Sequence, residues 1–243
     1  MGYLFLNSLM NNYFRFKQFT IQQERTAMKV GTDGVLLGAW ANMEKARHIL
    51  DIGTGTGVIA LMAAQKMEEA TIDAVEINLE AYEQACENVK QSPWVERIKL
   101  HHLSIFDFNP GITYDRIICN PPFFIESTPA PDKNRTQARH CLDFSHKNLL
   151  QSVKRLLSDN GHFCTILPTN EAIQLISLAR QENLYVSRLT RVLPTPVKPP
   201  KRYLMDFTSA PGTSLEQDMI LELSRHQYSD EYIQLTKDFY LYL

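Results

Sequence analysis

The sequence has few of the features that mark secreted, membrane or metal-binding proteins. It contains four cysteines, none in a C-x-x-C pair and none spaced with histidines as a zinc site requires. This pattern predicts reduced thiols, no metal site and a cytoplasmic location. No apolar run reaches the ~20 residues that span a bilayer. The N-terminal stretch lacks the basic start and small-residue cleavage site of a signal peptide, and Met1 and Met10 are alternative start residues.

The chain also lacks a strong excess of charge. Its formal net charge is −2, with 44% hydrophobic and 21% charged residues, which are ordinary values for a globular protein. These values exclude disordered, collagen-like and coiled-coil classes. They restrict any polyanion-binding surface to a local basic patch. A length of 243 residues fits one large domain with appendages.

From residue 47 onward, short apolar runs alternate with helical patterns. We expect strands at residues 47–52, 71–77, 97–103, 114–120 and 162–167, and helices at residues 58–67, 79–91 and 145–157. In the second helix, Leu79, Tyr82, Ala85, Cys86 and Val89 form the apolar face expected to pack on a sheet. The alternation predicts an α/β fold, namely a mostly parallel, doubly wound, Rossmann-like sheet.

The two ends of the chain do not follow this alternation of short strands and helices. Residues 184–193 and 202–210 look like two longer strands, which suggests an antiparallel hairpin at one edge of the sheet. Residues 219–224 predict a short strand, and the tail from residue 228 predicts a final helix. Residues 1–45 are interpreted as a cap segment and residues 46–243 as the main domain.

A glycine-rich turn follows the first predicted strand. Asp51 ends the strand, and Gly53, Gly55 and Gly57 come on alternate positions before a helix. Ligands of doubly wound folds bind beyond the carboxyl ends of such strands, and glycines there let a ligand approach the backbone. The spacing departs from the dinucleotide pattern G-x-G-x-x-G. An acidic residue beside the turn would repel a pyrophosphate, whereas it suits an amino group or a sulfonium.

The neighbouring strand ends carry further candidate ligands. Glu76 closes the second strand, where a carboxylate can accept both hydroxyl protons of a ribose, and Ile77 follows it. Ser104 comes directly after the third strand and Asp107 lies three residues further on, in the region where enzymes that use S-adenosylmethionine usually contact its adenine. Asp107 is alternatively a solvated loop carboxylate. Together these residues describe a pocket for S-adenosylmethionine better than one for a nicotinamide cofactor. A glycine turn without any ligand is the remaining alternative.

A second motif, Asn120-Pro121-Pro122-Phe123, ends the fourth strand. Pro121 restrains Asn120 to extended geometry, and the two prolines stiffen the turn. The result is a rigid pair of acceptors, the Asn120 side-chain oxygen and the Pro121 carbonyl. Such a pair suits a planar amine that gains positive charge as it attacks a methyl sulfonium. Phe123 offers a face on which a base can stack. The alternative is a proline-rich turn with core phenylalanines.

These motifs carry a resemblance to a known group. DIGTGTG and NPPF resemble class I S-adenosylmethionine-dependent methyltransferases that modify planar nitrogens. The segments KQFTIQQERTAMKVGTDGVLLGAWA, ICNPPFF and YSDEYIQLTKDFYL are similar to the bacterial tRNA1(Val) adenine-37 N6-methyltransferase family, from about Phe14 to the C-terminus. The resemblance implies methyl transfer to N6 of the adenosine 3′ to the anticodon. It implies that the NPPF residues lie at the reacting amine and that Asp51, Gly53, Gly55 and Glu76 lie at the cofactor. Ser104 departs from the acidic residue of many relatives.

The remaining features leave alternatives open. Thr32 or Asp33 is expected to cap the helix that follows, and the resemblance adds a contact between this segment, including Thr32, and the cofactor. Related families that also use N-P-P plus an aromatic residue methylate guanine N2 or a protein glutamine amide. A non-catalytic RNA module that binds S-adenosylmethionine is the alternative of another class. The sequence leaves the oligomeric state open. A basic rim that could hold tRNA phosphates comprises Lys133, Arg135, Arg139, Lys198, Lys201 and Arg202.

Overall fold

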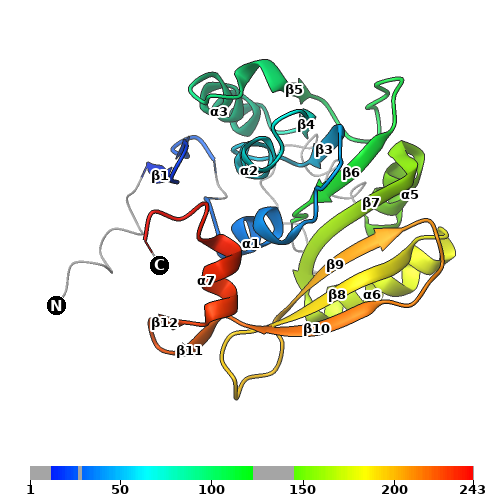
Figure 1. The fold of residues 1–243 in the computed structure, drawn as a ribbon. Helices are drawn as coiled ribbons and strands as arrows, with labels where there is room; N and C mark the ends of the chain where they lie inside the picture. The colour runs from blue at the N-terminus through cyan, green and yellow to red at the C-terminus, as the bar shows by residue number, and fades with distance from the viewer. Residues whose placement is uncertain (1–11, 27–28, 123–144, 243) are drawn as a thin grey trace, which may run out of the picture.

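An eight-stranded sheet forms the centre of the computed structural model, which describes residues 12–26, 29–122 and 145–242 (Figure 1). In chain order its strands are β3 (His48–Ile52), β4 (Thr71–Glu76), β5 (Ile98–His102), β6 (Tyr114–Cys119), β7 (Leu157–Pro168), β8 (Tyr185–Leu193), β9 (Arg202–Thr208) and β10 (Leu215–Ile220). Their lateral order is β10-β8-β9-β7-β6-β3-β4-β5. The central strands β3 and β6 are buried from Ile49 and from Ile117 to their carboxyl ends, as expected of parallel strands covered on both faces.

Only β9 runs against its neighbours in this sheet. It pairs antiparallel with β7 and β8, while the other neighbouring pairs are parallel. This confirms the mostly parallel, doubly wound sheet and the antiparallel hairpin. The hairpin is not outermost, however, because β10 adds a parallel strand outside β8. The strand expected at 219–224 is therefore corrected to β10 and a separate short strand, β11 (Glu222–Ser224), which pairs with β12 (Gln227–Tyr228).

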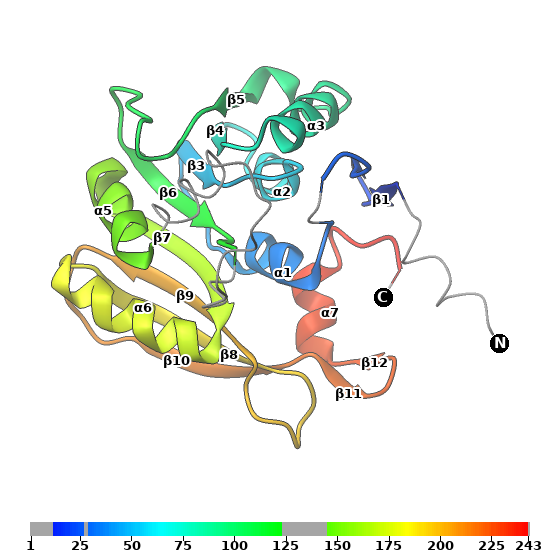
Figure 2. The same cartoon turned by 180° about the vertical axis from the view of Figure 1, so that it is seen from behind.

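Helices cover both faces of the sheet (Figures 1 and 2). One face carries α1 (Thr32–Trp40), α2 (Val58–Lys66), α3 (Leu79–Lys90) and α7 (Asp230–Thr236), and the other carries α5 (His146–Leu156) and α6 (Thr169–Gln181). Each face has its own cluster of buried apolar side chains, including Leu61 and Met62 on the first and Phe163 and Phe207 on the second. Burying each such side chain contributes about 1.5–3 kcal/mol to the stability of the folded chain, so both layers of helices stabilise the sheet.

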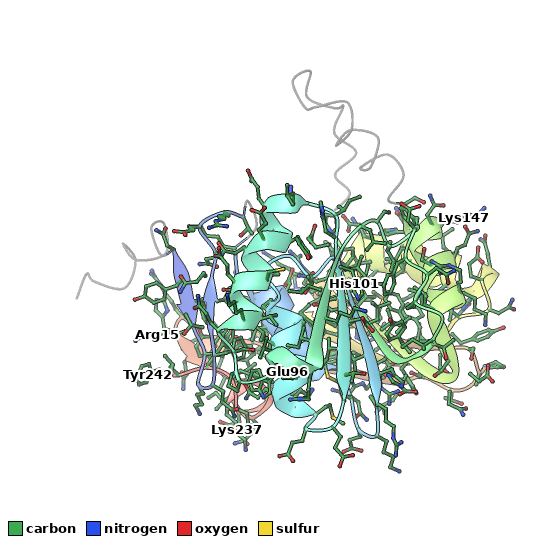
Figure 3. The ribbon with its side chains drawn as sticks, turned by 90° about the horizontal axis from the view of Figure 1, so that it is seen from above. Arg15, Glu96, His101, Lys147, Lys237 and Tyr242 are labelled. Carbon is green, nitrogen blue, oxygen red and sulfur yellow. The ribbon has the colours of Figure 1, made fainter. Side chains whose placement is uncertain are left out.

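The N-terminal segment packs on the C-terminal one. β1 (Tyr13–Arg15) and β2 (Thr20–Gln22) form a hairpin, and the Lys17 N–H donates to the Phe239 carbonyl (2.8 Å). Figure 3 accordingly shows Arg15 on the same side of the molecule as Lys237 and Tyr242. Phe16 and Phe19 belong to the same apolar cluster as α1 and α2. The division of the chain at residue 45 into a cap and a main domain stays a prediction.

The start of β7 differs from the expectation. A helix at 145–157 and a strand at 162–167 were expected, but α5 ends at Leu156 and β7 begins directly at Leu157. The pairing with β6 shifts register between Tyr114 and Arg116, so the extra residues bulge out of the ladder. A Cβ at Gly161 would lie 2.8 Å from the Tyr114 carbonyl oxygen, so this bulge requires glycine.

A short 3-10 helix, η1 (Val95–Arg97), precedes β5. In the described part of the chain, no helix has the length and apolar character needed to cross a bilayer.

Candidate active site

The glycine-rich turn connects the carboxyl end of β3 to α2. Gly53, Gly55 and Gly57 all have positive φ angles, 68°, 58° and 86°, which side-chain-bearing residues rarely adopt. Apart from the glycine and its two neighbours in the chain, no described residue has an atom within 4 Å of a Cβ built at Gly53 or Gly55, so this side of the turn is open. A Cβ at Gly57 would instead lie 3.6 Å from that of Ala85 on α3. Gly53 and Gly55 therefore leave room for a ligand, whereas Gly57 faces the packing between the turn and α3.

Asp51 lies beneath this turn with 1% of its surface exposed. Its Oδ2 accepts hydrogen bonds from the Thr54 hydroxyl (2.5 Å) and the Ala60 N–H (3.1 Å). Its Oδ1 has no hydrogen-bond partner among the described residues. Burial raises the pKa of Asp51 to about 7; the Glu76 carboxylate also raises it, and the two hydrogen bonds oppose the rise. An unpartnered, buried carboxylate oxygen is a natural acceptor for a cationic ligand group.

Glu76 ends β4, the strand beside β3, and is 8% exposed. Its Oε2 accepts the Gly55 N–H (2.9 Å) and its Oε1 accepts the Asn78 N–H (2.8 Å). A carboxylate has about four acceptor positions, so both oxygens can still accept the hydroxyls of a ribose. Ile77 follows with 41% of its surface exposed and offers an apolar wall beside Glu76.

The two candidate adenine contacts after β5 differ in their surroundings. Ser104 is 9% exposed, and its hydroxyl oxygen accepts the Phe106 N–H (3.3 Å). Asp107 is exposed and lines an open cavity of about 510 Å³ together with Asp73, Lys99 and His101. That cavity runs along β5, and its lining in the described part of the chain includes neither Glu76 nor the glycine turn. This geometry favours Ser104 over Asp107 as the neighbour of the turn.

Asn120 follows β6, which pairs with β3 on the side opposite β4. The Asn120 motif therefore follows the strand next to the one that leads into the glycine turn. Asn120 is half-buried, Pro121 is buried and Pro122 is exposed. A Cβ on Gly34 of α1 would lie 3.7 Å from the Asn120 Nδ2, so α1 packs beside this side chain. Phe123 lies outside the described residues.

The expected helix cap at Thr32 or Asp33 is wrong. α1 begins at Thr32 itself, with Gly31 as the N-cap and without a side-chain hydrogen bond to the cap. Asp33 instead accepts a charge-assisted hydrogen bond at its Oδ2 from the Arg202 Nε (2.8 Å). Thr32 is exposed at the first position of α1, two residues before Gly34.

Comparisons with known proteins agree with this geometry. A family model described as the methyltransferase small domain matches residues 28–172. Proteins from Parabacteroides distasonis, Phocaeicola vulgatus and Flavobacterium psychrophilum, each named tRNA1(Val) (adenine(37)-N6)-methyltransferase, are 45%, 46% and 46% identical to the chain. The matches cover 95%, 95% and 94% of this chain and 98%, 98% and 99% of the relatives. This chain belongs to the tRNA1(Val) (adenine(37)-N6)-methyltransferase family.

Solved structures of other methyltransferases share the fold of this chain. A predicted O-methyltransferase from Agrobacterium tumefaciens matches with a TM-score of 0.67 at 16% identity, over 85% of this chain and 96% of that chain. The ribosomal protein L11 methylase from Lactobacillus delbrueckii subsp. bulgaricus matches with a TM-score of 0.55 at 15% identity, over 76% of this chain and 82% of that chain. At these identities the likeness concerns the fold, and it confirms the expected class I methyltransferase architecture.

The candidate RNA contacts of the methyltransferase do not share one environment. Lys198 and Lys201 are exposed in the loop between β8 and β9. Arg202 is half-buried and forms the ion pair with Asp33, so its charge is engaged within the protein. Lys133, Arg135 and Arg139 lie outside the described residues.

Sequence reasoning overlooked several side chains of the site. Thr54 stands three residues after Asp51, a spacing that favours a local hydroxyl-to-carboxylate bond, so it could have been found. Gln84 and Asn88 are buried on α3, whereas Leu79, assigned to the apolar face, is 51% exposed. The side-chain amides of Gln84 and Asn88 form hydrogen bonds with the backbone of residues 25 and 22, which are far away in sequence. Local periodicity carries no signal for such partners.

Proposed function

We propose that this chain transfers a methyl group from S-adenosylmethionine to N6 of an adenosine in tRNA, at position 37 of tRNA1(Val). The names of its relatives support this substrate. The structural observation that carries the proposal is the position of Asn120, at the end of the strand next to the open glycine turn. With tRNA as the substrate, we expect the enzyme to act in the cytoplasm.

The residues at the turn fit S-adenosylmethionine. The open side at Gly53 and Gly55 leaves space for the ligand, and the unpartnered Oδ1 of Asp51 can face a cationic group of its methionine end. Glu76 would accept the ribose hydroxyls and Ile77 would lie beside the base, which the Gly55 N–H bond to Glu76 and the exposure of Ile77 support. When bound there, S-adenosylmethionine supplies an electrophilic methyl group.

The chain's own contribution at the reacting amine comes from Asn120 and Pro121. The side-chain oxygen of Asn120 and the carbonyl of Pro121 would accept the two N6 hydrogens and orient the amine. These acceptors stabilise positive charge as it develops on the nitrogen, and such preorganised stabilisation is often the largest catalytic effect. We expect Pro122 to keep the turn rigid and Phe123 to stack on the extruded base, which offsets an unstacking cost of a few kcal/mol.

The test is mass spectrometry of nucleosides from tRNA treated with the protein and S-adenosylmethionine. The substrate should come from cells without this enzyme, and tRNA1(Val) with adenosine 37 replaced serves as a matched control. Appearance of N6-methyladenosine only with intact tRNA1(Val) is the expected result. Methylated guanine would favour the guanine N2 reaction, and transfer to protein would favour the glutamine reaction. Cofactor binding without any transfer would favour the non-catalytic module.

A further inference from the structure

The buried amide of Asn88 connects two parts of the chain that are far apart in sequence. Asn88 lies on α3 with 1% of its surface exposed. Its Oδ1 accepts the Gln22 N–H (2.8 Å), and its Nδ2 donates to the Gln22 carbonyl (2.9 Å) and to the Thr56 carbonyl (2.9 Å). Both of its N–H donors and its oxygen are therefore used. One side chain bridges β2 and the glycine turn.

Thr56 is a sensitive point of this turn. It lies between Gly55 and Gly57, whose φ angles are both positive, and it is itself buried. Asn88 fixes the direction of the Thr56 carbonyl from the side of α3, where Gly57 also packs on Ala85. The opposite side of the turn, at Gly55, stays open. Asn88 therefore fixes the turn from the side of α3, opposite the space that a ligand would occupy.

The other end of the bridge leads to the reacting site. We define the N-terminal arm as residues 20–26 and 29–34. Within it, the Val30 N–H donates to the Gln23 side-chain oxygen (2.9 Å), and the Arg25 N–H donates to the Gln84 oxygen on α3 (3.3 Å). The arm ends in α1 at Gly34, beside Asn120. It therefore contacts α3 at one end and lies beside Asn120 at the other.

We propose that Asn88 is a positioning residue that keeps the glycine turn in its ligand-binding form and couples the turn to the N-terminal arm beside Asn120. This inference rests on the proposed function. If Asn88 is replaced, the Thr56 carbonyl no longer has its buried donor and the turn is free to leave the ordered form. The apparent dissociation constant then rises in inverse proportion to the competent fraction. The arm keeps its contact with Gln84 on α3 but loses its hydrogen-bonded connection to Thr56 of the turn, so it no longer responds to a ligand bound there.

The first test needs no substitution. Hydrogen–deuterium exchange is measured on the unmodified protein with and without S-adenosylhomocysteine, the demethylated product. We expect slower exchange at residues 53–57 and also in the arm. Protection confined to the turn would overturn the coupling.

The second test compares two buried positions of the same helix end. Asn88→Ala should raise the dissociation constant for S-adenosylhomocysteine by roughly tenfold, because leaving one buried carbonyl without its donor shifts an equilibrium by about that factor. It should also abolish protection of the arm. Ser92→Ala is the control, because the Ser92 hydroxyl bonds only Val89 and Trp94 in the described structure. It should leave both readouts unchanged.

The outcomes separate this inference from the proposed function. A folded Asn88→Ala protein with unchanged affinity and arm protection would overturn the positioning role. An equal loss in Ser92→Ala would also overturn it, since general destabilisation of α3 would then explain the effect. Failure of the unmodified protein to bind S-adenosylhomocysteine would overturn the proposed function and the inference together.

Discussion

Replacing Asp51 by asparagine should stabilise the unliganded protein while weakening cofactor binding. The carboxyl is buried and its pKa is raised from 3.8 to about 7, chiefly by burial. A difference of that size corresponds to about 4 kcal/mol. Between about pH 4 and 7 the unfolded chain releases a proton that the folded chain keeps, so the free energy of unfolding falls as pH rises through this window. Above pH 7 the full cost is present.

The amide introduced by Asp51→Asn would be neutral at every pH and would avoid this cost. Its side-chain oxygen can still accept from Thr54 and Ala60, but its N–H₂ group would occupy the place of Oδ1, which has no partner among the described residues. An unsatisfied buried donor costs about 1–3 kcal/mol. The net gain above pH 7 is therefore roughly 2 kcal/mol, or roughly 4–8 °C in melting temperature for a chain of this size.

The binding effect of Asp51→Asn should have the opposite sign. A hydrogen bond to a charged group contributes about 1.5–3 kcal/mol, so the affinity for S-adenosylmethionine should fall roughly 10- to 100-fold. Adenosine is the matched control ligand because it lacks the cationic groups, and its affinity should not change. In the unmodified protein, S-adenosylmethionine affinity should rise from pH 5.5 to 7 as Asp51 ionises.

Thermal unfolding at pH 5 and pH 8, with calorimetric titration of both ligands, checks these statements. The melting temperature of Asp51→Asn should exceed that of the unmodified protein at pH 8, and the gain should be smaller at pH 5. Equal changes at the two pH values would refute the assigned ionisation of Asp51. Unchanged affinity for S-adenosylmethionine would refute its role at the cationic end of the ligand.

Three other predictions address the reacting site and the basic loop. Asn120→Ala should lower the single-turnover rate on the order of 10²–10³-fold with little change in tRNA affinity, because the missing acceptor acts mainly as charge develops; a wild-type rate would make the motif a mere turn. Lys198→Ala with Lys201→Ala should reduce the slope of log tRNA affinity against log salt concentration by roughly 0.7–0.9 for each phosphate that is no longer bound. An unchanged slope would identify the loop as ordinary surface. Arg202→Ala should instead lower thermal stability. Gly34→Ala should be tolerated, since its Cβ would lie at an ordinary 3.7 Å from the Asn120 Nδ2. Gly34→Val should lower the methyl-transfer rate without affecting S-adenosylhomocysteine binding. Equal rates for the two variants would contradict this placement of α1.

The sequence predicted the parts of this fold that depend on local patterns. Apolar runs that end in Asp51, Glu76 and Asn120 identify buried parallel strands, and right-handed crossovers then bring their carboxyl ends together. The glycine spacing identified the turn because positive φ angles restrict the residue type. This is why the strand ends and the glycine turn of the candidate site were largely predictable.

Features that depend on distant partners were not predictable. The Arg202–Asp33 pair joins residues 169 positions apart, and a basic residue in a basic loop gives no sign that its charge is already engaged. The same holds for Asn88, whose polarity on the buried side of α3 contradicts a simple apolar stripe. β10 was misplaced for a related reason: its alternation is weak, and only the exposed edge of β8 determines where it pairs.

Energetically unfavourable groups gather at one end of the sheet and are held there by the rest of the fold. Asp51 is buried with an unpartnered oxygen, and three glycines hold left-handed backbone angles a few residues away. The opposite ends of the neighbouring helices show the reverse pattern. Lys66 donates to three carbonyls at and just beyond the end of α1, and Arg97 donates to three carbonyls near the end of α2. A methyltransferase that must receive a cationic ligand benefits from this division, because stabilising contacts far from the pocket offset the cost of keeping an uncompensated carboxylate within it.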